Sequence, residues 1–399
     1  MPDANARLPM MILVAGCLIC LISLGVRSSF GLFLASVSAD FGWGREVFAF
    51  GIAVQNLMWG LGQPLAGMVA DKFGNGRAIA AGGICYAIGV ALMAKTTSPL
   101  DFHVSAGLLV GLGLGGTGFG VVLAAMGRAV SNERRALVLG LGTAFGSLGQ
   151  FLMVPLGQSF LSAYGWQTAL LYLSLIAALM IPLTWPLRTR TREHFGPSGQ
   201  SLGAALKEAG RYPSYLLLTA GYFVCGFHVA FIGVHLPAYV TDKGLSAEIG
   251  AWALAIVGLA NVVGSILAGI AGSRLSKKYC LCFLYSARAV VIAIFVLTPA
   301  SPVSVLLFAL VMGLLWLSTV PLTTALVAQM FGVRYMATLV GIVFFSHQMG
   351  SFTGIWLGGY LYDATGSYDV VWWLGVALGL FAALVHWPIN EQSLRPAEA

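Results

Sequence analysis

Four side chains that can carry a positive charge lie inside long apolar stretches of this sequence: Arg27, His228, Arg288 and His347. An ionisable group inside such a stretch is costly and usually faces a cavity or a partner. All fourteen acidic residues, in contrast, lie in termini, in loops or at the ends of apolar stretches. A buried cation without an acid nearby can bind an anion, and the planar guanidinium of Arg27 fits a carboxylate.

Arg27 admits two interpretations. It follows an uncharged stretch from Leu8 to Val26, and an unpaired guanidinium at the centre of a membrane span costs roughly 2.5–3.5 kcal/mol. Water, backbone carbonyls or a bound anion can offset that cost. We expect Arg27 to bind the anionic group of a substrate. The alternative is a structural arginine that is held by carbonyls or extends toward the membrane surface.

Further polar side chains at similar depth extend the predicted site. Imidazole titrates near neutral pH, so His228 and His347 are candidates for carrying a coupling proton, although each can equally be a neutral structural histidine. For Arg288 we expect a structural role. The predicted substrate site comprises Arg27, Asn56, His228, Asn261, Trp316, His347 and Gln348.

Catalytic chemistry is not supported by these residue types. The apolar stretches contain no serine–histidine–acid set at one depth, no cluster with metal-ligand spacing, and no acid to pair with a histidine. We therefore expect no enzymatic activity, no metal and no cofactor.

The composition indicates a membrane protein. Of the 399 residues 58% are apolar and only 9% are charged, whereas a soluble domain usually carries about 25% charged residues. Uncharged stretches long enough to cross the bilayer recur along the chain. They predict an all-α membrane protein with twelve transmembrane helices near 9–36, 46–70, 77–95, 102–127, 136–160, 166–187, 214–239, 248–272, 279–298, 303–328, 336–361 and 370–388.

The predicted spans form two halves of six helices, 1–187 and 214–399, joined by a polar, basic linker over 188–213. An offset of 201 places Gly140 of the first half on Gly341 of the second, and an offset of 202 places Gly67 on Gly269. Repeated halves around a site at the bilayer midplane are typical of secondary transporters.

Basic residues predict the orientation. With the N-terminus inside, sixteen of the 21 lysines and arginines fall on the cytoplasmic side, and only Arg45, Lys95 and Lys243 fall outside. The positive-inside rule then places both termini and the linker in the cytoplasm. Contact with anionic lipid accounts for the net charge of +7, so nucleic acid is not an expected partner.

The segment "GMVADKFGNGR" (67–77) resembles the signature loop between the second and third spans of the major facilitator superfamily. This resemblance implies the twelve-helix fold of that superfamily. It also implies a latch at the cytoplasmic side, formed by Gly67, Asp71, Gly74 and Arg77. The second half carries Ser273 where the first has Asp71, so we expect an asymmetric latch.

Within the superfamily, the chain is most similar to monocarboxylate-transporter-like bacterial permeases, over residues 29–74, "YSARAV" and "SHQMGSFTGIWLGGYLYDATGSY" (346–368). This resemblance implies a monomeric, proton-coupled carrier of small organic anions in the bacterial inner membrane, working by alternating access. Asn261 and Ser265 stand where such transporters place an aspartate and an arginine in span eight. Coupling would then depend on Arg27 and the histidines.

A proton-driven exporter of drugs or amphiphilic, siderophore-like metabolites is the alternative. Such exporters usually have an arginine in span four and a Gly-Pro pair in span five. Here Gly107 occupies the first position, and Gly149 is separated from Pro155. Both departures favour the organic-anion carrier.

Overall fold

The described residues of the computed structural model, 4–188, 201–332 and 335–394, are almost entirely helical and form no β-strand. The first half contains α1 (Ala4–Ser28), η1 (Phe30–Phe33), α2 (Leu34–Phe41), α3 (Arg45–Phe73), α4 (Asn75–Met93), α5 (Pro99–Phe102), the π-helix η2 (His103–Leu109), α6 (Val110–Thr117), α7 (Phe119–Arg128), α8 (Asn132–Ala178), α9 (Met180–Leu183) and η3 (Trp185–Leu187). The second contains α10 (Leu202–Ala209), α11 (Pro213–Asp242), α12 (Ala247–Arg274), α13 (Lys277–Leu297), α14 (Pro302–Leu315), α15 (Thr319–Phe331), α16 (Met336–Thr365) and α17 (Asp369–His386).

These helices confirm the predicted fold class. Nine helical segments of the described residues are long and apolar enough to cross a membrane. One of them, Leu137–Leu183, holds two predicted spans, because Gly165 adopts a left-handed φ of 76° and reverses the chain inside α8. The helices α3 and α16, of 29 and 30 residues, supply the other two of the twelve.

The fourth span of each half is interrupted at a corresponding place. In the first half, Gly118 separates α6 from α7, and in the second, residues 316–318 separate α14 from α15. Adding 201 to 118 gives Thr319, the first residue of α15. Broken helices at the midplane are common in transporters, where the exposed backbone groups border a binding site.

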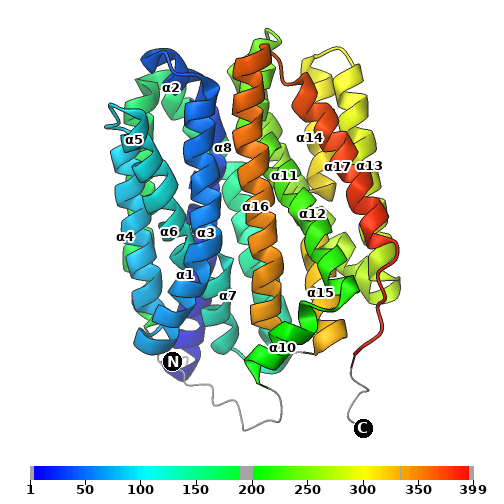
Figure 1. Cartoon of the computed structure of the whole chain (residues 1–399). Helices are drawn as coiled ribbons and strands as arrows, with labels where there is room; N and C mark the ends of the chain where they lie inside the picture. The colour runs from blue at the N-terminus through cyan, green and yellow to red at the C-terminus, as the bar shows by residue number, and fades with distance from the viewer. Residues whose placement is uncertain (1–3, 189–200, 333–334, 395–399) are drawn as a thin grey trace.

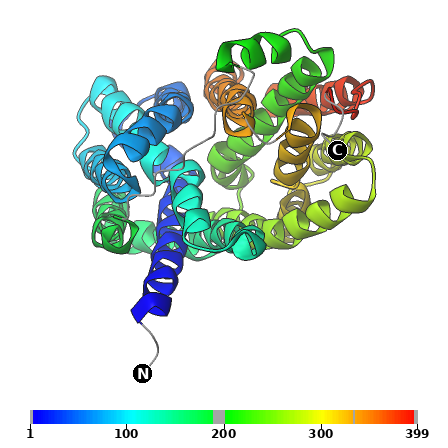
Figure 2. The same ribbon diagram turned by 90° about the horizontal axis from the view of Figure 1, so that it is seen from below.

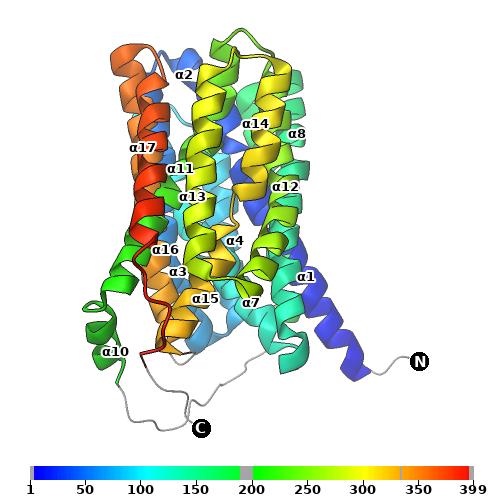
Figure 3. The same ribbon diagram turned by 90° about the vertical axis from the view of Figure 1, so that its right-hand side faces the viewer.

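The described residues begin and end at the same end of the molecule as α10 (Figure 1), and the helices run roughly parallel to one another in the view turned by a right angle about the vertical (Figure 3). In accord with the charge pattern, we call this the inner end and the opposite end the outer end. The linker predicted over 188–213 contains α10, and its residues 189–200 lie outside the described residues.

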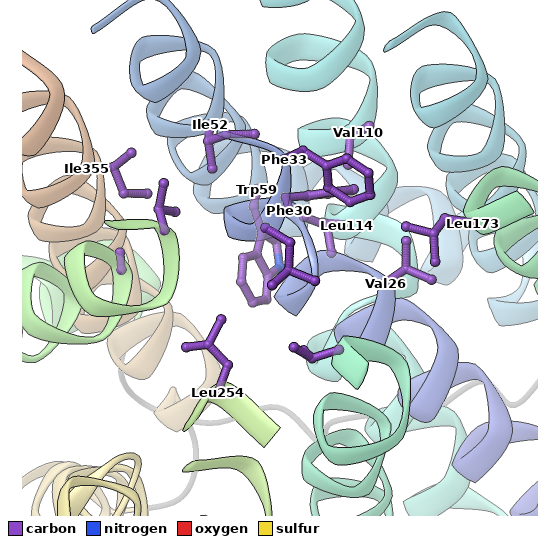
Figure 4. Packing of buried hydrophobic residues seen from close by; sticks show 14 of the residues in the cluster. Val26, Phe30, Phe33, Ile52, Trp59, Val110, Leu114, Leu173, Leu254 and Ile355 are labelled. Carbon is purple, nitrogen blue, oxygen red and sulfur yellow. The ribbon is translucent and has the colours of Figure 1, made fainter. Parts of the chain in front are cut away.

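The two halves pack together in the outer part of the molecule. A Cβ on Gly359 of α16 would lie 2.7 Å from the Cβ of Ala49 in α3, and one on Gly258 of α12 would lie 2.9 Å from the carbonyl oxygen of Ser147 in α8. The buried cluster that includes Val26 and Phe33 also extends to Leu254 and Ile355 of the other half (Figure 4).

Toward the inner end, the same four helices separate. A Cβ on Gly67 of α3, Gly140 of α8, Gly269 of α12 or Gly341 of α16 would meet no atom within 4 Å. The view from below shows the two halves side by side, adjoining where α8 runs along α12 (Figure 2). The structure is therefore closed at its outer end and parted at its inner end.

Candidate functional site

Arg27 lies at the end of α1, just before the chain changes to the 3-10 turn η1. Its side chain is half-buried, and Nη2 donates a hydrogen bond of 2.6 Å to Oδ1 of Asn56 in α3. The guanidinium carbon lies 5.0 Å from the centre of the Trp59 ring, within the range of a cation–π contact. The Nε atom is buried without a hydrogen-bond partner among the described residues.

No carboxylate neutralises Arg27 among the described residues, where Arg45 and Asp242 form the one ion pair. Its charge is met by an amide oxygen and an aromatic face, which are both neutral. A half-buried cation in such surroundings is undercompensated, and an anion bound beside it would stabilise it.

A chain of polar groups leads from Arg27 into the second half. The backbone carbonyl of Asn56 accepts a 3.1 Å hydrogen bond from Nε2 of Gln348 in α16. The Gln348 amide oxygen lies 3.1 Å from Nδ1 of His347, and since that oxygen only accepts, Nδ1 carries the hydrogen. The structure thus brings together four of the predicted site residues, Arg27, Asn56, His347 and Gln348.

This polar chain lies where the halves begin to part. A Cβ on Gly60, one helical turn further inward than Asn56, would still lie 3.1 Å from the side chains of Gln348 and Phe345. The rings of Trp59 and Phe344 also meet across the halves, at 5.5 Å. Further inward, Gly67 and Gly341 face open space. A ligand entering from the inner end would therefore reach the polar chain at the end of its path.

His347 is packed against α11, beside groups that the sequence did not single out. Its ring lies 5.0 Å from that of Tyr222. One helical turn after Tyr222, Sγ of Cys225 lies 3.2 Å from Oγ1 of Thr319, the first residue of α15. No spacing in the sequence indicates these contacts, because the partners are about a hundred residues apart.

The remaining predicted site residues, His228, Asn261 and Trp316, make contacts outside this polar chain. His228 is 1% exposed, and its Nε2 lies 2.7 Å from the Gly375 carbonyl oxygen of α17, away from Arg27. Asn261 donates to Oγ of Ser147 at 2.9 Å and accepts the backbone N–H of Leu317 at 2.9 Å. Trp316 lies in the interruption between α14 and α15 and is 4% exposed.

Arg288 is fully buried and stabilises the same interruption, in line with the structural role expected for it. Its Nε and Nη2 donate to the carbonyl of Leu315, at 3.1 and 2.6 Å, and Nη2 also donates to the carbonyl of Trp316. Two side chains, Asn261 and Arg288, therefore satisfy backbone groups that the broken helix leaves unpaired.

The predicted latch residues lie at the inner ends of α3 and α4. Asp71 and Arg77 are exposed, and Asp71 makes no ion pair within the described part of the chain. Gly74 ends α3 with a φ of 93°, which favours glycine. Arg128 of α7 donates to Oδ1 of Asn75 at 2.5 Å, so an asparagine within the motif binds an arginine of another helix.

The outer end carries a polar network that the sequence did not indicate, which we call the outer gate: Arg45, His235, Asp242, Asp363 and Tyr368. Nη1 and Nη2 of Arg45, in the first half, donate to both carboxylate oxygens of Asp242, in the second, at 2.7 and 2.6 Å. Asp363 of α16 accepts the backbone N–H groups of Arg45 and Glu46 at 2.9 and 2.8 Å, and so caps the first turn of α3 from the opposite half.

Comparisons with known proteins agree with this architecture. The sequence model of the Major Facilitator Superfamily matches residues 16–352 and 218–398. The chain is 28% identical to monocarboxylate transporter 13 of Bos taurus over 358 residues, covering 86% of this chain and 80% of that protein. It is 24% identical to the uncharacterized MFS-type transporter YcxA of Bacillus subtilis, covering 86% of each.

Two solved structures share the fold. A bacterial homologue of the human lysosomal transporter Spinster, in an inward-facing and unoccupied conformation, superposes with a TM-score of 0.74 at 16% identity, covering 95% of this chain and 96% of that one. A D-xylose–proton symporter gives 0.72 at 15% identity, covering 98% and 100%.

Proposed function

Because the chain belongs to the major facilitator superfamily, whose members named above are transporters and not enzymes, we propose that it is a secondary active transporter of a small organic anion. We further propose a monocarboxylate or related carboxylate as substrate and coupling to protons. The expected setting is the bacterial inner membrane, with both termini in the cytoplasm and the chain acting as a monomer. Relatives named monocarboxylate transporters support this choice of substrate class.

The observation that carries the proposal is the environment of Arg27. Its Nη2 is bound to the neutral amide oxygen of Asn56 at 2.6 Å, and no described carboxylate contacts it. A carboxylate ligand would offer the guanidinium a charged acceptor in place of that amide, and charge-assisted bonds are roughly twice as strong as neutral ones. We infer that the substrate carboxylate binds Arg27 beside Asn56.

The proposed cycle is alternating access. The outer end is closed and the inner end parted, so the anion would exchange with the cytoplasm in this conformation. Gln348 hydrogen-bonds to the backbone carbonyl of Asn56, so the second half contacts the same residue whose side-chain amide binds Arg27. His347, through its Nδ1–H bond to Gln348, is the proposed proton-responsive group of the site. We do not assign proton coupling to His228, because its ring is hydrogen-bonded to the Gly375 carbonyl of α17.

Thermal unfolding of the purified protein tests the proposal, since a ligand that binds only the folded state stabilises it. Short carboxylates, larger organic anions and lipophilic cations would each be added to wild type, to Arg27→Gln and to Arg274→Gln. Arg274 is an exposed arginine at the inner end of α12 and serves as the matched control.

We expect short carboxylates to raise the melting temperature of wild type and of Arg274→Gln, and to leave that of Arg27→Gln unchanged. At a ligand concentration 100 times Kd, the stabilisation is about 2.7 kcal/mol. Equal stabilisation of Arg27→Gln by carboxylates would make the arginine structural. Stabilisation by lipophilic cations alone, in all three proteins, would favour the exporter.

A further inference from the structure

The outer gate contains a histidine, His235, whose hydrogen-bond partners determine which ring nitrogen carries the hydrogen. His235 of α11 is completely buried, with Nε2 at 2.8 Å from the carbonyl oxygen of Ile355 and Nδ1 at 3.1 Å from the Tyr368 hydroxyl. Because a carbonyl only accepts, Nε2 must carry the ring hydrogen of the neutral form. Nδ1 is then the acceptor, and the Tyr368 hydroxyl donates to it.

Tyr368 joins this histidine to the contact between the halves. Its hydroxyl oxygen accepts a 2.8 Å hydrogen bond from Nη1 of Arg45, the arginine that also binds Asp242. Burial raises the pKa of the Tyr368 phenol, so the hydroxyl keeps the hydrogen that it donates to His235. The result is one directional series, from Arg45 to Tyr368 to His235 to the Ile355 carbonyl.

A second proton on His235 does not fit this series. It would turn Nδ1 into a donor, directed at a hydroxyl oxygen that already accepts from Arg45, and the hydroxyl hydrogen would lose its acceptor. It would also place a cation beside the Arg45 guanidinium. The ring cannot move aside within the closed structure, because it lies between the rings of Phe231 and Tyr368, at 5.4 and 5.2 Å, and a Cβ on Gly358 would lie 2.6 Å from Nε2.

Three acidic groups near the gate, Glu46, Asp242 and Asp363, are already engaged, and the fourth, Asp369, is exposed at the surface. Both oxygens of Asp242 bind Arg45, both oxygens of Asp363 accept backbone N–H groups, and Glu46 accepts the indole N–H of Trp356 at 2.9 Å. The titratable and charged groups around His235 and its partners are Arg45 and Glu46 of α3, Tyr239 and Asp242 of α11, Tyr362 and Asp363 of α16, Tyr368, and Asp369 of α17.

We propose that His235 is a proton-binding site that opens the outer gate: binding a proton from the outer side breaks the Arg45–Tyr368–His235 series and separates the halves there. The closed gate accommodates only the neutral ring of His235, and the open gate exposes the imidazolium to water. By linkage, neutral His235 therefore stabilises the closed gate and protonated His235 stabilises the open gate. The inference concerns the empty protein, so it holds or fails independently of the anion assigned to Arg27.

Distances between spin labels on the two halves test it in the complete protein in lipid nanodiscs. Labels on a ketone-bearing amino acid at Lys95 and Lys243, both exposed at the outer end, avoid the six native cysteines. We expect lowering the pH from 8 to 5 to raise the ratio of open to closed outer ends, by up to about tenfold per pH unit for one proton.

In His235→Gln we expect that pH response to disappear, provided that its melting temperature at pH 8 matches wild type. His103→Gln is the control, because His103 also lies at the outer end but binds the Val47 carbonyl of its own half at 2.9 Å; it should respond as wild type does. A second variant, Tyr368→Phe, keeps His235 but removes the link to Arg45, and should raise the open fraction already at pH 8.

Three results would overturn the inference. They are a wild-type ratio that does not change with pH, a full response in His235→Gln, and a response lost in Asp242→Asn but kept in His235→Gln. The last would assign the proton to the carboxylate that binds Arg45.

Discussion

Substitution of Asn56 gives the clearest test of a single residue of the site, because its amide oxygen is the one acceptor that Arg27 has among the described residues. In Asn56→Asp a carboxylate would replace that oxygen and bind the guanidinium permanently. We expect this variant to fold and to lose affinity for carboxylates by at least about tenfold, or 1.4 kcal/mol, since the substrate must displace an ion pair. Isothermal titration with the best carboxylate from the thermal screen measures the loss.

The control at this position is Asn56→Ser, whose shorter side chain leaves Arg27 without a charged partner. The backbone carbonyl that accepts from Gln348 is unchanged in both variants. Affinity should be kept or increased in the serine variant. Unaltered carboxylate binding by Asn56→Asp would remove Asn56, and with it the proposed position of the substrate, from the site.

A site residue could be predicted from the sequence when its own type and position were unusual, and not when only a distant partner gives it a role. Arg27, Asn56, His347 and Gln348 stood out because they are polar at mid-span, and they meet in the structure. His228 stood out for the same reason, but its ring is hydrogen-bonded to the Gly375 carbonyl of α17 and not to this group. The partners Arg45 and Asp242 are 197 residues apart, and nothing in the sequence links them.

At the scale of single elements, glycine determines how closely neighbouring helices of the bundle pack. A Cβ on Gly350 of α16 would overlap the carbonyl of Phe223 in α11, whereas one on Gly341 of the same helix would meet nothing within 4 Å. We expect Gly350→Ala to cost about 1–3 kcal/mol through overpacking. Gly341→Ala should be neutral or slightly stabilising, because alanine favours the helix by up to about 1 kcal/mol.

Thermal unfolding of the two alanine variants, side by side, measures this difference. Equal melting temperatures would mean that α11 and α16 can move apart without loss of stability.

The number and type of helices could be predicted from the sequence, since uncharged apolar stretches long enough to cross a membrane are visible in the composition. The helix interruption at 316–318 was not, because it is stabilised by Arg288 and Asn261 from other helices.

At the scale of the whole molecule, the proposed alternating access requires the glycine-bearing surfaces of the parted inner end to meet when the outer end opens. Gly67 and Gly341 lie on α3 and α16, which pack together further out and separate here. Rocking of the halves about the polar chain would bring these two inner segments into contact. A bulky side chain at either position would be accommodated in the present conformation and excluded from the opposite one.

We therefore expect Gly67→Trp and Gly341→Trp to bind the carboxylate as wild type does in the thermal assay, yet to lose nearly all transport into proteoliposomes. Gly203→Trp, at an exposed glycine of α10 with no atom within 4 Å of a Cβ, controls for the added indole and should transport normally. Normal transport by both inner-end variants would mean that α3 and α16 do not approach at this level. Loss of binding together with transport would instead indicate a disturbed fold.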